Sequence, residues 1–183
     1  NFQIEDTSFI NKKTTSDFSG YDKSTLTSEV IEIYVDNQSA NSFKTLNTSF
    51  MLVTRETPFY PEGGGQISDT GRIYNDNMQI RVANTQRVNN LILHHVILES
   101  GEIKVNDNIK MEIDTDRRKR IAINHSSTHL LNHALRHVLG KHVEQKGSLV
   151  TDQSLRFDFS HNKALSNDEI ASIEKIISNE IES

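Results

Sequence analysis

The chain has 183 residues, 34% of them apolar, which is enough for one ordinary domain or two small packed subdomains. It contains no cysteine, which excludes disulfides, thiolate catalysis and sulfur-ligated zinc unless such ligands lie outside this sequence. The net charge of −5 requires any nucleic-acid partner to meet a local basic patch, and the lack of a secretion signal or of roughly 20 consecutive apolar residues predicts a cytoplasmic protein without a membrane partner.

Short runs of β-branched and aromatic residues, separated by turn residues, follow a polar start. Residues 1–27 are rich in Ser, Thr, Asn and Lys, so we predict a connector that leads into a domain. The runs within residues 28–115 predict a small antiparallel, barrel-like subdomain with turns at Asn89-Asn90 and at Gly101. The predicted strands are Val30–Val35, Phe50–Thr54, Met78–Val88, Leu91–Leu98 and Ile109–Ile113.

Helical spacing of apolar residues begins after Asp114 and predicts a long helix over Arg117–Leu139. Residues 114–116 can cap its start, and the glycine at position 140 can end it. A strand is predicted over Leu155–Phe159, and Ser166 with Glu169 forms a capping-box pattern before a final amphipathic helix. The predicted fold class is α+β: the barrel-like subdomain is followed by an α+β core over residues 116–183 that carries a long histidine-bearing helix.

His125 and His129 lie four residues apart within the predicted long helix. Side chains at this spacing project from one helix face, so both imidazoles can reach one metal ion, although two surface histidines would show the same spacing. His133 and His137 continue the pattern, but each step of four rotates the direction by about 40°, so at most an adjacent pair binds one ion. Ser126 stands where zinc proteases with this spacing place a glutamate base, which argues against a protease.

A glycine-rich segment over Thr57–Gly71 holds both prolines of the chain. Its consecutive glycines Gly63, Gly64 and Gly65 allow positive φ angles and let a substrate approach the backbone, while a glycine-rich surface turn is the alternative. The segment is not a nucleotide P-loop, because no Lys followed by Ser or Thr completes that pattern.

A basic run occupies Arg117, Arg118, Lys119 and Arg120, at the start of the predicted long helix. These side chains can pair with phosphates, but a basic turn near a helix is equally compatible with a solvated surface.

Four segments, taken in order, resemble the editing region of alanyl-tRNA synthetases and the related free-standing alanyl-tRNA editing proteins. They are Thr57–Gly71, His125–Gly140, His142–Ser148 and Leu155–His161, and the resemblance covers most of residues 18–161. Phe18–Tyr21 also resembles the segment that leads into editing in the full synthetase, which favours a synthetase region over a free-standing protein.

The resemblance implies a hydrolase that clears serine or glycine from tRNA(Ala), in a fold shared with the editing domain of threonyl-tRNA synthetases. It makes His125 and His129 zinc ligands and, with Gln145, catalytic residues. It also implies that the remaining ligands lie in a downstream Cys-x-x-x-His segment, so we expect this sequence to stop within the editing domain. His142 or His161 could replace a missing ligand. Two imidazoles and water alone should hold zinc weakly, so we expect a partly occupied or empty metal site in this sequence.

Selecting serine against alanine requires a group that pairs with the serine hydroxyl. Thr57 is the predicted partner, and Gly63, Gly64, Gly65 and Gln66 complete the predicted substrate-binding set; a turn-capping role is the alternative for Thr57. The basic run 117–120 is predicted to bind tRNA. The expected partners are therefore the acceptor end of tRNA(Ala) and the other domains of the full-length, ATP-binding synthetase.

Three alternatives stay open at this point. A free-standing trans-editing protein would perform the same hydrolysis without being joined to a synthetase. A noncatalytic tRNA-binding module would bind RNA in a salt-sensitive way that survives loss of both histidines. A metal-dependent hydrolase acting on another ester is the third, because fold resemblance alone does not fix a substrate.

Overall fold

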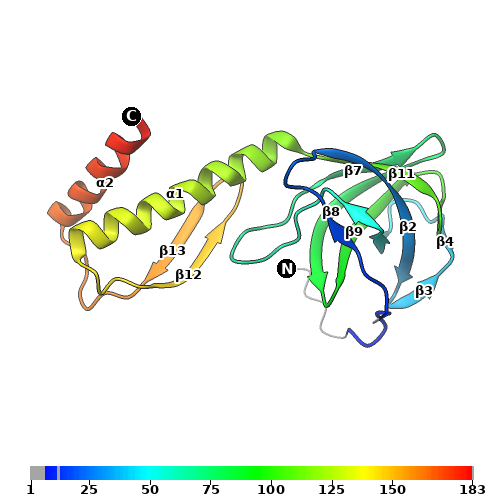
Figure 1. The fold of residues 1–183 in the computed structure, drawn as a ribbon, viewed down its shortest axis with the longest axis horizontal. Helices are drawn as coiled ribbons and strands as arrows, with labels where there is room; N and C mark the ends of the chain where they lie inside the picture. Colours follow the sequence, from blue (N-terminus) through cyan, green and yellow to red (C-terminus); the bar gives the residue numbers. More distant parts are fainter. Residues whose placement is uncertain (1–6, 12, 183) are drawn as a thin grey trace. The chain divides into compact units, whose positions relative to one another are not determined.

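The computed structural model describes residues 7–11 and 13–182, which form two compact units (Figure 1). The barrel unit comprises Asn1–Gly63 and Ser68–Arg118, and the helical unit comprises Gly64–Ile67 and Lys119–Ser183. The predicted boundaries at residues 27 and 115 stay a prediction, and the part of the predicted connector over residues 1–6 and 12 lies outside the described residues.

An antiparallel barrel forms the centre of the first unit. Hydrogen bonding joins its strands in the order β11-β7-β8-β9-β5-β2, and β11 also pairs with β2, which closes the ring. Register shifts in β2 and β8 supply the bulges that let flat strands curl into a barrel. The ring strands are β2 (Thr25–Val35), β5 (Ser49–Thr54), β7 (Gly71–Asn75), β8 (Met78–Val88), β9 (Leu91–Ser100) and β11 (Asn108–Ile113).

Five short strands accompany the ring. β3 (Gln38–Ala40) adds to β2, while β1 (Asp17–Phe18) pairs in parallel with β6 (Glu56–Thr57). β4 (Ser42–Phe43) pairs antiparallel with β10 (Ile103–Lys104).

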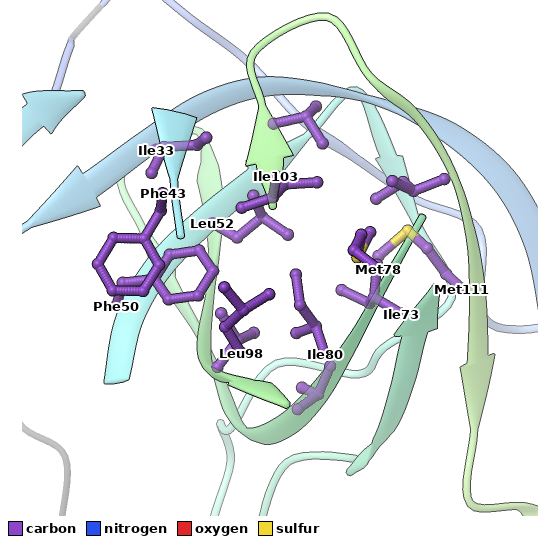
Figure 2. Close-up of a cluster of buried hydrophobic side chains, with 14 of the residues drawn as sticks. Ile33, Phe43, Phe50, Leu52, Ile73, Met78, Ile80, Leu98, Ile103 and Met111 are labelled. Atoms are coloured by element: carbon purple, nitrogen blue, oxygen red, sulfur yellow. The ribbon is translucent and has the colours of Figure 1, made fainter. Parts of the chain in front are cut away.

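The barrel interior is filled by apolar side chains from every ring strand (Figure 2). In β8 the side chains of Met78, Ile80 and Val82 are buried while the residues between them are exposed, as expected for a strand with one face on the core. Phe43 and Phe50 pack with their ring centroids 4.3 Å apart. The barrel is therefore a packed core rather than a channel.

The helical unit consists of α1 (Thr115–Leu139) from Lys119 onward, the antiparallel hairpin of β12 (Gln145–Val150) and β13 (Leu155–Phe159), and α2 (Asn167–Glu182). Its small core joins Ala134 and Leu135 of α1 to Ile173 of α2, with Phe157 and Phe159 of β13 packed against it. At the start of α2, the side chains of Ser166 and Glu169 each accept from the other residue's backbone N–H. This reciprocal pair confirms the predicted capping box.

The predicted α+β fold class, with a barrel followed by a long histidine-bearing helix, is confirmed. Asp114 caps α1 by accepting from the Arg117 N–H at 2.9 Å, and the turn glycine and asparagine at positions 101 and 89 have φ angles of 79° and 54°. Sequence patterns missed the strands of two or three residues and also β7 and β12, because these have either too few residues or too few apolar residues to show a period of two. Within residues 7–11 and 13–182, no helix has the length and apolarity required to cross a bilayer.

Candidate functional site

His125 and His129 lie on one face of α1, both exposed, with their ring centroids 5.0 Å apart and their planes inclined by 38°. Asn124 fixes this part of the helix, because its amide donates to the Thr151 carbonyl in the turn between β12 and β13 at 2.8 Å. Two imidazoles in this arrangement fit adjacent ligands of one zinc ion. Within the described part of the chain, no group of three or more His, Cys, Asp or Glu side chains that could hold a metal ion occurs, so the metal-ligand role of His125 and His129 stays a prediction.

The glycine-rich segment brings Gln66 onto the first of these histidines. The Gln66 Oε1 atom lies 2.8 Å from His125 Nδ1. The segment reaches this position by pairing with β12: Gly65 accepts from the Val150 N–H at 2.7 Å, and Ile67 donates to the Val150 carbonyl at 3.1 Å. Gly64 and Gly65 have φ angles of 61° and 82°, so two of the three consecutive glycines adopt the positive φ that this residue type allows.

Gly63 and Gln145 are two further residues of the predicted site. Gly63 is exposed and belongs to the barrel unit, so the predicted substrate-binding glycines are divided between the two units. Gln145 is exposed at the start of β12, where its Nε2 donates to Ser148 Oγ at 3.1 Å. Ser148 in turn contacts Gly65, since a Cβ at position 65 would lie 2.7 Å from Ser148 Oγ. Gln145 is thereby linked to the glycine-rich segment through one serine.

Thr57 belongs to the barrel unit and its side chain is fully buried. Its Oγ1 lies 2.8 Å from His94 Nε2 and accepts from the Phe59 N–H at 3.1 Å. The Nδ1 atom of His94 lies 2.9 Å from the Leu52 carbonyl oxygen, which can only accept. Burial lowers the pKa of His94 to about 4, so the ring is neutral, Nδ1 carries the proton, and Nε2 accepts from the Thr57 hydroxyl.

His94 was missed at the sequence level, because the adjacent His94 and His95 within an apolar strand point to opposite faces and carry no spacing signal for a shared site. In the structure His94 Nε2 accepts the hydroxyl proton of Thr57, and the Phe59 N–H donates to one of the two hydroxyl lone pairs. The proposed pairing of Thr57 with a substrate hydroxyl stays a prediction, and it would have to use the remaining lone pair.

In the basic run, two side chains form hydrogen bonds within the barrel unit and two are exposed. The Arg118 guanidinium pairs with the buried carboxylate of Asp69 and donates to the carbonyls of Gly20 and Pro58, each at 2.6 Å. Arg117 donates to the Ser68 carbonyl at 2.6 Å. Lys119 and Arg120 are exposed, and Arg120 lies 3.7 Å from Asp152. The tRNA-binding role of the run stays a prediction, carried mainly by its exposed half.

His142 and His161 form a second pair, with His142 Nε2 and His161 Nδ1 2.9 Å apart. They join the start of the β12–β13 hairpin to its end. Because the described residues contain no cluster of three metal-ligating side chains, neither histidine joins His125 and His129 in this structure.

Comparison with known proteins identifies relatives for most of the chain. The family model described as tRNA synthetases class II (A) matches residues 1–117. The chain is 46% identical over 159 residues to an alanine–tRNA ligase of Leptospira biflexa, a match that covers 87% of the chain and 17% of that protein. It is 45% identical over 175 residues to the enzyme of Burkholderia lata, covering 94% of the chain and 20% of that protein.

An alanine–tRNA ligase of Rickettsia felis is 42% identical over 160 residues, covering 87% of the chain and 18% of that protein. The chain thus spans about a fifth of the length of these curated relatives. Since the family model covers well over half of the chain and the relatives cover most of it, the chain belongs to the class II tRNA synthetase (A) family and is a region similar to alanine–tRNA ligases.

Proposed function

We propose that this chain is the editing region of an alanine–tRNA ligase, which hydrolyses the ester of Ser-tRNA(Ala) or Gly-tRNA(Ala). The observation that carries the proposal is the pair of exposed imidazoles of His125 and His129 on one helix face, with Gln66 placed against the first ring. The alanine–tRNA ligase relatives supply the substrate class. The sequence segments that resemble editing proteins supply the reaction class.

In the proposed reaction, His125 and His129 hold a zinc ion together with ligands outside this sequence. Zinc, when bound, lowers the pKa of a water molecule or polarises an ester carbonyl, so no protein nucleophile is required. The chain's own residues bind the substrate and orient its ester beside the two imidazoles. The glycine-rich segment brings backbone and the Gln66 amide beside the imidazoles, and Gln145 supports that segment through Ser148.

The exposed side chains of Lys119 and Arg120, which lie more than one helical turn before His125 on α1, are proposed to meet phosphates of the tRNA acceptor end. They supply the local positive charge that a chain with a net charge of −5 requires to approach RNA.

The test is hydrolysis of serine-charged tRNA(Ala) by this chain and by a longer chain that continues through the implied Cys-x-x-x-His segment, each with and without zinc. We expect hydrolysis by the longer chain with zinc, and its loss in His125→Ala. Full activity in His125→Ala would overturn the metal-site assignment. tRNA binding without hydrolysis in either chain would instead support a noncatalytic tRNA-binding module.

A further inference from the structure

The backbone at Gln66 is held on both sides by hydrogen bonds of its neighbours, which fixes the point from which its side chain extends. The residues before and after it, Gly65 and Ile67, both bond to Val150 at the end of β12. The close approach requires glycine at position 65, because a Cβ there would lie 2.5 Å from the Ser148 carbonyl oxygen. The Gln66 side chain therefore extends from a backbone position fixed by these hydrogen bonds, and its amide lies beside the His125 ring.

The contact between Gln66 Oε1 and His125 Nδ1 has a definite polarity. An amide oxygen can only accept a hydrogen bond, so at 2.8 Å the imidazole must place its proton on Nδ1. In a neutral ring with its proton on Nδ1, the Nε2 atom carries no proton and has a free lone pair. Metal-bound histidines in proteins commonly donate their other ring N–H to an oxygen in this way, which fixes both the tautomer and the ring direction.

We propose that Gln66 is a positioning residue that locks His125 in the Nδ1–H tautomer and presents its Nε2 lone pair as a zinc ligand. The proposal rests on the proposed function for the identity of the metal and replaces a direct substrate-binding role for the Gln66 side chain. The glycine-rich segment then affects the hydrolysis indirectly, because it orients the zinc ligand His125. His129 has no such oxygen partner among the hydrogen bonds of the described residues, so the two imidazoles differ in how firmly they are oriented.

The first experiment reads the tautomer directly in the metal-free chain. A long-range proton–nitrogen correlation spectrum distinguishes a protonated ring nitrogen from a bare one, recorded well above the ordinary histidine pKa of about 6.5. His125 can be assigned among the eight histidines by its disappearance in His125→Asn. We expect protonated Nδ1 and bare Nε2 in the wild type, and a mixture of tautomers in Gln66→Leu. Protonated Nε2 in the wild type would overturn the proposal.

The second experiment measures zinc affinity by competition with a chromophoric chelator, in the longer chain that includes the Cys-x-x-x-His segment. Gln66→Leu removes the acceptor and should weaken zinc binding by about 10- to 100-fold. Gln66→Glu keeps an oxygen acceptor and should retain the affinity. The same glutamine-to-leucine exchange at Gln153, exposed in the turn between β12 and β13, is the matched control and should change nothing.

Failure of this proposal and failure of the proposed function give different results. Unchanged zinc affinity in Gln66→Leu overturns the positioning role, whatever the substrate is. If the tautomer and the affinity behave as expected while serine-charged tRNA(Ala) is not hydrolysed, the positioning role stands and the editing function does not.

Discussion

The His94 imidazole is fully buried in the barrel unit and hydrogen bonded at both ring nitrogens. Protonating it would place a charge in an apolar interior and would turn the Nε2 acceptor into a donor facing the Thr57 hydroxyl. Burial therefore lowers the pKa of His94 to about 4, against 6.5 for an exposed histidine. The neighbouring His95 has its pKa lowered by burial as well.

This depression makes the stability of the barrel depend on pH. Between about 6.5 and 4 the unfolded chain binds a proton at His94 that the folded chain does not, so the free energy of unfolding falls as the pH drops through this window. The loss attributable to His94 approaches about 3 kcal/mol. Urea unfolding at a series of pH values measures how the free energy of unfolding depends on pH. This dependence should be weaker in His94→Gln than in the wild type, and an equal dependence in both would contradict a buried neutral His94.

Thr57→Val tests the two roles considered for this residue. Valine matches the shape of threonine but leaves His94 Nε2 and the Phe59 N–H without a partner, so the free energy of unfolding should fall by about 1–3 kcal/mol. A role in reading the substrate would appear separately, as a loss of serine-ester hydrolysis with glycine-ester hydrolysis preserved. An equal loss for both esters would assign Thr57 to the barrel alone.

Arg118→Ala should destabilise the barrel unit, because it leaves the carboxylate of Asp69 buried without its counter-ion. The expected decrease in the free energy of unfolding is about 3 kcal/mol, measured by urea titration. Arg120→Ala removes an exposed arginine from the same run and should change stability by less than about 0.5 kcal/mol. If Arg118 served mainly to bind RNA, its loss would reduce RNA affinity and leave the unfolding midpoint unchanged.

At the scale of elements, the helices followed from sequence more completely than the strands did. The shared helix face of His125 and His129 and the capping residues Asp114, Ser166 and Glu169 follow from local signals, and the structure confirms the face and the caps. The contact of Gln66 with His125 joins residues 59 positions apart and depends on backbone pairing with β12. No local pattern encodes such a contact, and β12 itself has a polar sequence.

Gly65→Ala should detach the glycine-rich segment from β12. The added Cβ would meet the Ser148 carbonyl at 2.5 Å, and the φ angle of 82° is unfavourable for alanine. The Val150 N–H, which donates to Gly65, should then exchange with solvent faster, as measured by amide hydrogen exchange. Gly63→Ala is the control, since the nearest atom to its added Cβ lies 3.9 Å away; equal exchange at Val150 in both variants would contradict the fit at position 65.

At the scale of the whole chain, the barrel class was predictable from the sequence. Its strands show either alternating apolar and polar residues or continuous apolar residues, and turn residues separate them. The closure of the barrel was not predictable, because the pairing of β11 with β2 joins residues far apart in the sequence, such as Asn108 and Glu29. A closed ring leaves few unpaired backbone groups at strand edges, and such edges are the usual templates for aggregation. β3 is the strand that extends the sheet beyond the ring among the described residues, and it is short.

The membership of Gly64–Ile67 in the helical unit has a consequence for dissecting the protein. The chain passes between the two units at residues 63/64, 67/68 and 118/119, so no single cut separates them. A gene fragment starting at Lys119 would encode both helix-borne histidines but would omit Gln66 and leave both backbone groups of Val150 without their partners. Such a fragment would therefore retain the two histidines without the tetrapeptide that pairs with β12.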